Sequence, residues 1–124
     1  MQPNLPDGAQ EKMQELEELQ ERGEDVVRRR AQLEQQLERS EDGRELLRES
    51  GEEAETVLLT MDDVSVEVDY ETALDHFEDK IQSLQDQVSG LERREQKVEQ
   101  QMEDLQEELQ DMMEEFQSGP AGGQ

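Results

Sequence analysis

Cysteine and tryptophan are absent from this sequence of 124 residues, and aromatic residues make up only 2% of it. Without cysteine the chain has no disulfide framework and no thiolate metal site. The hydrophobic fraction of 30% is too small for a compact core of ordinary depth. One layer of apolar side chains between helices needs no more than this, so the composition favours paired helices over a globule.

Long hydrophobic runs and basic residues are also scarce. No run approaches the roughly 18 to 20 residues of a membrane span, and the first residues lack the basic and apolar regions of a signal peptide. Lysine and arginine total 12 against 36 acidic residues, which gives a net charge of -24. Such a surface repels phosphate. We therefore expect a cytoplasmic protein that binds neither membrane nor nucleic acid.

The acidic surplus carries a further expectation, because only three of the basic residues are lysines. An acidic, lysine-poor surface is typical of proteins from a salt-loaded cytoplasm, where a Debye length of about 3 Å at 1 M salt screens self-repulsion. This halophilic interpretation predicts a fold that weakens in dilute buffer. An ordinary acidic coiled coil is the alternative.

Residues 69–117 carry the strongest pattern. Apolar side chains recur at alternating spacings of four and three residues from Tyr70 to Phe116, and Glu95 is the one interruption. A repeat of 3.5 residues keeps one stripe facing a partner helix, so it predicts a left-handed coiled coil. Asp69 is suited to cap the start of this helix, and residues 118–124 are predicted to be a flexible tail.

A weaker form of the same repeat runs through residues 7–51, where six of eleven stripe positions are apolar. Asp7 and Gln10 form a capping-box pattern at its start, and Gly51 is a natural stop. Gly23 and Gly43 each cost about 1 kcal/mol relative to alanine inside a helix. We expect this helix to be the less stable of the two.

Between the helices, residues 56–68 alternate as β-strands do. The segments Thr56–Met61 and Val64–Val68 are rich in β-branched residues, and Asp62 and Asp63 separate them. This predicts a hairpin, although non-glycine residues resist the positive φ of a tight turn. An isolated hairpin is marginal in water and leaves two unpaired edges, so we expect these strands to pair with other chains.

The expected fold is therefore mainly α: one domain of residues 1–124, in which an antiparallel two-helix coiled coil is joined by a single β-hairpin that assembles with other subunits. Aligning the stripes so that Leu33 faces Leu91 places Arg30 opposite Glu95. A slip of one heptad would leave Glu95 facing Gly23 or Leu37 instead, so this pair is predicted to fix the register. Chance alignment of two polar breaks is the alternative.

Three stretches of the chain resemble a known family: the opening MQPNLP with AQEK, the central DYETALDHFEDKIQSL, and the closing REQKVEQQMEDLQEELQDM. They are similar to the β-class subunit of archaeal prefoldin over nearly the whole chain. A single hairpin fits that class, because α-class subunits carry two. Residues 58–62 (LLTMD) lack the tyrosine and glycine of the family's Tyr-x-x-Val-Gly run, which leaves a diverged paralogue as an alternative.

The resemblance implies an ATP-independent holdase without cofactors, built as a hetero-hexamer of two α and four β subunits. Hairpins form its β-barrel base, and the coiled-coil tips bind unfolded polypeptides and pass them to a group II chaperonin. The implied partners are thus the prefoldin alpha subunit, further beta copies, unfolded clients and the chaperonin. The implied assembly-strand residues are Val57, Leu59, Val64, Val66 and Val68.

Methionines support client binding at the tips, because four of the six lie in the half of the helices away from the hairpin. Methionine is flexible and polarisable, which suits varied apolar clients. We expect client contact at Leu5, Met13, Met112, Met113 and Phe116. For Met102, Met112 and Phe116, which hold stripe positions, packing in the coiled coil is the alternative.

No catalytic residue or metal site is predicted, because paired helices offer no desolvated cleft. His76, the only histidine, is interpreted as a solvated surface residue. The alternative function is a structural coiled-coil scaffold or spacer without client binding. The connector of 18 residues between Gly51 and Tyr70 favours assembly, since a spacer needs only a short turn.

Overall fold

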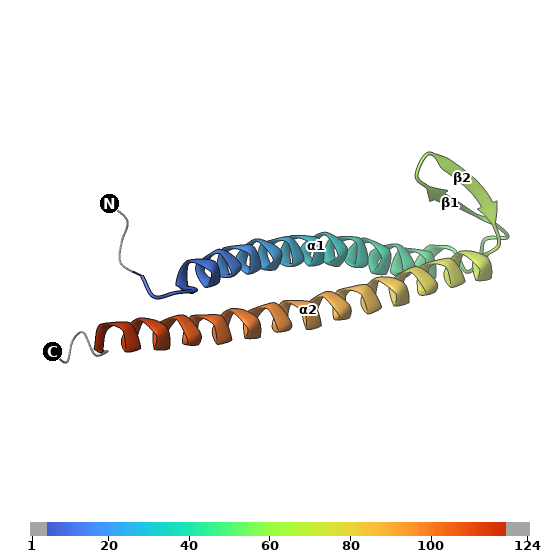
Figure 1. The fold of residues 1–124 in the computed structure, drawn as a ribbon. Helices are drawn as coiled ribbons and strands as arrows, with labels where there is room; N and C mark the ends of the chain where they lie inside the picture. The colour runs from blue at the N-terminus through green and yellow to red at the C-terminus, as the bar shows by residue number, and fades with distance from the viewer. Residues whose placement is uncertain (1–4, 119–124) are drawn as a thin grey trace. The chain divides into compact units, whose positions relative to one another are not determined.

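The computed structural model describes residues 5–118, which form two long helices with a two-stranded antiparallel hairpin between them (Figure 1). Helix α1 spans Ala9–Ser50 and helix α2 spans Tyr70–Ser118. Strand β1 spans Val57–Met61 and strand β2 spans Val64–Val68. The predicted fold class is confirmed. The predicted tail lies outside the described residues, except for Ser118, which ends α2.

The described chain divides into two compact units. The hairpin unit is Arg29–Leu91 and holds the end of α1, both strands and the start of α2. The terminal unit holds the described residues up to Arg28 and from Glu92 onward, which are the start of α1 and the end of α2. Each unit is described separately below.

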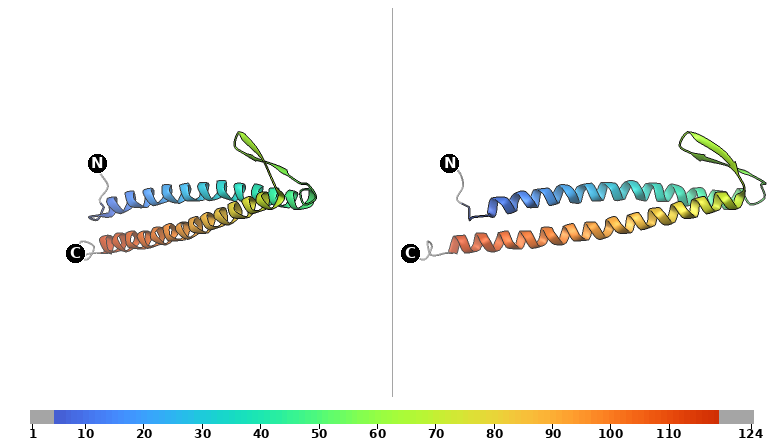
Figure 2. Two further views of the ribbon diagram at one scale, coloured as in Figure 1. Left: turned by 90° about the vertical axis from the view of Figure 1, so that its right-hand side faces the viewer. Right: turned by 45° about the vertical axis from the view of Figure 1, so that its right-hand side comes forward.

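In the hairpin unit, the segments of α1 and α2 lie side by side and run antiparallel (Figure 2). Leu33, Leu84 and Val88 form a buried cluster, against which Leu37 and Leu91 pack. All five are stripe positions of the 3.5-residue repeat. The repeat thus positions the core, as expected for paired helices. Ser40, also on the stripe, is the buried polar residue of this core.

In the terminal unit, the apolar stripe is also the buried side of the helices. Ala9 and Val26 are buried on α1, and Val98 and Leu105 are buried on α2. Three of these four are stripe positions, and Ala9 is the first residue of its helix. The unit is therefore held by one layer of small and medium side chains.

The helix ends follow local hydrogen bonds. The Thr72 N–H donates to Asp69 Oδ1 at 2.7 Å, so Asp69 caps α2 as predicted. At the start of α1 the expectation for Asp7 is wrong: the Gly8 carbonyl accepts the first helical bond from the Lys12 N–H at 3.1 Å, so Gly8 is the N-cap. At the end of α1, the Gly51 N–H donates to the Leu47 carbonyl at 2.7 Å.

The hairpin pairs Val57 with Val68 at its open end and Met61 with Val64 beside the turn. Asp62 takes a φ of 53° in that turn. This is the left-handed region that a short polar side chain tolerates better than most. The turn forms here without glycine.

Candidate functional surfaces

The hairpin has two chemically different faces. Residues paired across an antiparallel ladder share a face, and faces alternate along each strand. One face is wholly apolar, and its members are Val57, Leu59, Met61, Val64, Val66 and Val68. The other face holds Leu58, Thr60, Ser65 and Glu67, with the Thr60 and Ser65 hydroxyls 3.0 Å apart. All five predicted assembly-strand residues therefore lie together on the apolar face.

The apolar face is covered only in part by this chain. Leu59 is buried, and Val57 and Val68 at the open end are half-buried. Met61, Val64 and Val66 nearer the turn are exposed, and Val64 is 59% exposed. Leaving aliphatic side chains of a sheet exposed to water is unfavourable in free energy, and burial against a partner would remove that cost. This half of the face thus has the character of an interface.

A groove of about 530 Å³ lies between the hairpin and α2. Leu59 and Met61 line it from β1, and His76 and Phe77 line it from α2. The rings of His76 and Phe77 meet edge to face with centroids 5.9 Å apart. His76 is half-buried, so this surface histidine is partly covered rather than open to solvent on all sides. The helical repeat could not show this, because the covering residues come from the hairpin.

Two leucines that lie outside both apolar patterns are strongly exposed. Leu46 on α1 is 68% exposed, and Leu58 lies exposed on the polar face of the hairpin. Neither belongs to the apolar stripe or to the alternating apolar face. In a chain with so few hydrophobic residues, a leucine that lies outside the apolar stripe is the signal that could have identified these exposed residues.

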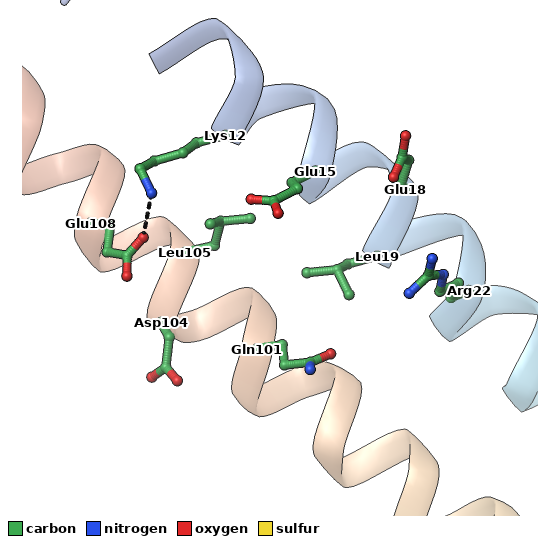
Figure 3. A pocket seen from close by; sticks show the side chains of 9 residues that line it. All are labelled: Lys12, Glu15, Glu18, Leu19, Arg22, Gln101, Asp104, Leu105 and Glu108. Atoms are coloured by element: carbon green, nitrogen blue, oxygen red, sulfur yellow. Dashed lines mark hydrogen bonds and ion pairs between the residues drawn. The ribbon is translucent and has the colours of Figure 1, made fainter. Parts of the chain in front are cut away.

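In the terminal unit, Lys12 Nζ and Glu108 Oε2 form an ion pair of 2.8 Å between α1 and α2 (Figure 3). The hydrogen bond from Lys12 to Glu108, together with the attraction between their charges, raises the pKa of Lys12. Leu19 and Leu105 point into the space between the two helix segments beside it (Figure 3). These residues line a groove of about 430 Å³ that also holds several carboxylates.

The five predicted client-contact residues all fall in the terminal unit. Met13 and Phe116 are 42% and 41% exposed. Leu5, Met112 and Met113 are half-buried, and Met112 Cε lies 3.8 Å from the position that a Cβ on Gly8 would take. The exposure of Phe116 disfavours the alternative that it is a core residue. All five keep surface available for contact.

A second groove of the terminal unit, of about 560 Å³, was not anticipated from sequence. It runs between Gly23 to Arg28 on α1 and Glu95 to Met102 on α2. Val27 lies in it and is 42% exposed, although its neighbour Val26 is buried on the stripe. Two adjacent valines face in different directions on a helix, and only one of them is used for packing.

The predicted register pair is divided between the two units. Arg30 is half-buried in the hairpin unit, where its guanidinium Nη1 pairs with Glu34 Oε1 at 2.7 Å. Glu95 is half-buried in the terminal unit. Both are thus at the margin of the buried stripe, and their role in fixing register stays a prediction.

Among residues 5–118 there is no group of three or more histidine, aspartate or glutamate side chains placed to hold a metal ion. Within the same range, neither helix has a stretch apolar enough to cross a membrane.

Comparison with known proteins gives consistent matches. A family model described as prefoldin subunit matches residues 10–116. The prefoldin beta subunits of two Halobacterium salinarum strains are each 40% identical over 81 residues, which is 65% of this chain and 64% of theirs. The match thus spans slightly under two thirds of those relatives. The crystal structure of the prefoldin beta subunit from Thermococcus strain KS-1 matches with a TM-score of 0.78 at 23% identity, covering 89% of this chain and 96% of that one, which shows the shared fold. Because the family model covers most of the sequence, this chain belongs to the prefoldin subunit family, whose members are known as chaperone components.

Proposed function

We propose that this chain is a subunit of an ATP-independent holdase that assembles through its hairpin and binds unfolded polypeptides near the ends of its helices. The observation that carries the proposal is the apolar hairpin face, on which Met61, Val64 and Val66 are exposed. A protein that only spaces two helices does not need an exposed apolar face on its connector. A subunit that completes its sheet with strands of other chains needs one as an interface.

Assembly follows from the physical chemistry of the hairpin. A two-stranded sheet is marginally stable alone, and its outer edges offer unpaired N–H and C=O groups. Partner strands paired at these edges would satisfy the groups, and closure of the extended sheet into a barrel would enclose the exposed valines. We propose a hetero-hexamer in the cytoplasm, in which the partners are the prefoldin alpha subunit and further beta copies.

Client binding is proposed for the terminal unit. Met13 and Phe116 offer exposed apolar surface there, and Leu5, Met112 and Met113 are half-buried beside it. Methionine side chains adapt to apolar partners of varied shape. The proposed sequence of events is capture of an unfolded segment, followed by transfer to a group II chaperonin.

The test is suppression of aggregation of a chemically denatured client by this chain mixed with a candidate alpha partner, without ATP. The buffer contains about 1 M KCl, because the acidic surplus is screened there. The tested variant carries Met13→Ser and Phe116→Ser. The matched control carries Gln14→Ser and Gln117→Ser, which change exposed polar neighbours.

We expect the wild-type and control assemblies to protect the client and the Met13→Ser/Phe116→Ser assembly to protect it several-fold less, with equal assembly mass by light scattering. A chain that assembles but never protects would support the scaffold alternative. Equal protection by the variant and the control would show that the client site is elsewhere.

A further inference from the structure

We infer that the groove between Gly23–Arg28 of α1 and Glu95–Met102 of α2 binds segments of unfolded polypeptide in which aliphatic side chains are flanked by lysine or arginine. The inference rests on the proposed holdase function and specifies the class of client sequence that this surface selects. Its volume of about 560 Å³ can hold more than one aliphatic side chain.

The floor of the groove is apolar. Val27 is exposed and lies off the stripe that packs the two helices together. Met102 lines the groove from α2 and is half-buried, so its flexible side chain can adjust to an occupant. Val98 also lines the groove and is itself buried. An aliphatic side chain entering here would exchange water contact for contact with valine and methionine.

Gly23 widens this floor, although helix packing does not require a glycine there. A Cβ added to Gly23 would meet the nearest atom, Val98 Cγ1, at 3.5 Å, which is an ordinary contact. Alanine would therefore fit and would favour the helix. Gly23 weakens the helix and is not needed for close packing. Its main effect is to leave the volume of a side chain open in the groove.

The rim of the groove is acidic. Glu24 and Glu99 are exposed, and neither forms an ion pair within residues 5–118. Glu95 also lines the groove. The one cation of the rim, Arg28, pairs with Asp25 at 3.1 Å, which offsets its charge. The potential at the rim is therefore negative and attracts lysine and arginine side chains.

The negative charge of the rim also favours one kind of occupant of the groove over another. A second copy of this chain carries a net charge of -24 and would bring like charge to an acidic rim. A cationic and aliphatic segment complements both the rim and the floor. Unfolded segments of this composition become accessible before a protein folds, which is the state that a holdase meets.

The experiment measures binding of three fluorescein-labelled peptides to the full assembly by anisotropy, in KCl from about 0.1 M to about 1 M. The first peptide alternates leucine, serine and lysine. In the second, glutamine replaces lysine, and in the third, serine replaces leucine. The tested variant is Glu24→Lys/Glu99→Lys. The matched control is Glu17→Lys/Glu103→Lys, which makes the same change of charge at exposed positions outside the groove.

We expect the wild-type assembly to bind the first peptide most tightly. The groove variant should weaken that binding about tenfold at low salt, which corresponds to about 1.4 kcal/mol, and less as salt screens the rim. The control should weaken binding of the first peptide less than about twofold, because interactions between solvent-exposed charges contribute little free energy. Gly23→Leu, which fills the floor without breaking the helix, should weaken both leucine-containing peptides.

The inference is overturned if the groove variant and the control lose the same affinity, because general attraction to an acidic surface then explains binding. It is also overturned if either groove variant changes self-association by sedimentation, which would identify a second copy as the occupant. Protection of a denatured client without peptide binding would reject this inference and leave the proposed function standing. Absence of both would reject both.

Discussion

Gly43 of α1 and Phe77 of α2 approach so closely that a Cβ on Gly43 would lie 2.7 Å from Phe77 Cε1 and 2.9 Å from Cζ. The Gly43→Ala substitution should therefore destabilise the protein, although alanine favours helices by about 1 kcal/mol. Overpacking costs about 1–3 kcal/mol, so we expect a net loss on the order of 1 kcal/mol. Urea unfolding at fixed protein concentration would measure it.

A double-mutant cycle tests the reason for that loss. Phe77→Leu removes the ring that the new methyl group meets, so Gly43→Ala should be harmless or favourable in that background. Additive effects of Gly43→Ala and Phe77→Leu would show that the contact is not the cause.

Gly23→Ala should have the opposite sign. The nearest atom to its new Cβ is Val98 Cγ1 at 3.5 Å, so no neighbour has to move. We expect a gain of up to about 1 kcal/mol from helix propensity, seen as a higher urea midpoint with an unchanged slope. A lower midpoint would mean that the helix is bent or crowded at this residue.

The cap of α2 should make stability depend on pH in the acid range. A side-chain hydrogen bond from Thr72, and then its backbone N–H, lower the pKa of Asp69 below its ordinary value. A carboxylate with a depressed pKa in the folded state contributes stability above its unfolded pKa of about 3.9. This contribution is lost as pH falls through the folded pKa.

Asp69→Asn isolates that contribution, because asparagine is an N-cap of similar quality without a charge. The Tm of the wild type should exceed that of Asp69→Asn near neutral pH, and the difference should vanish in acid. Thermal melts of both proteins by circular dichroism, from about pH 6 to about pH 2, span the unfolded pKa. A difference that grows in acid would contradict the assignment.

Val66→Asp should prevent assembly, because it places a carboxylate on the exposed half of the apolar hairpin face. Burial of an unpaired charge at an interface is strongly unfavourable. We expect the mass of the proposed hexamer to be lost in size-exclusion chromatography with light scattering, with the helical signal retained. Ser65→Asp, on the opposite face of β2, is the matched control and should assemble. Normal assembly of Val66→Asp would exclude this face as the interface.

The sequence was sufficient for most features that depend on near neighbours along the chain, although the cap expected at Asp7 was wrong. The four-three repeat located both helices, and β-branched alternation located the strands. Asp69 could be identified as a cap because its partner Thr72 is three residues away. These features need only periodicity and short-range hydrogen bonding, which a single sequence displays.

Features that depend on the distance between helices could not be predicted. Gly23 and Gly43 were assigned the same penalty, and only the distances to Val98 and Phe77 distinguish them. Val27 could not be recognised as a groove residue, because that requires knowing which face of α1 the other helix covers. The roles of the tip residues depend on partners, and the role of Arg30 with Glu95 depends on the register of the two helices, so both stay predictions.

The bare valines beside the hairpin turn also bear on how the cell supplies this chain. A copy made in excess of its partners would display the same signal, solvent-exposed aliphatic surface, by which unfolded proteins are captured. In the proposed holdase, such unassembled copies would compete with clients for binding, and their free edges would be open to strand-by-strand aggregation. If the proposed assembly forms, its hairpin chemistry therefore calls for balanced synthesis of the different subunits.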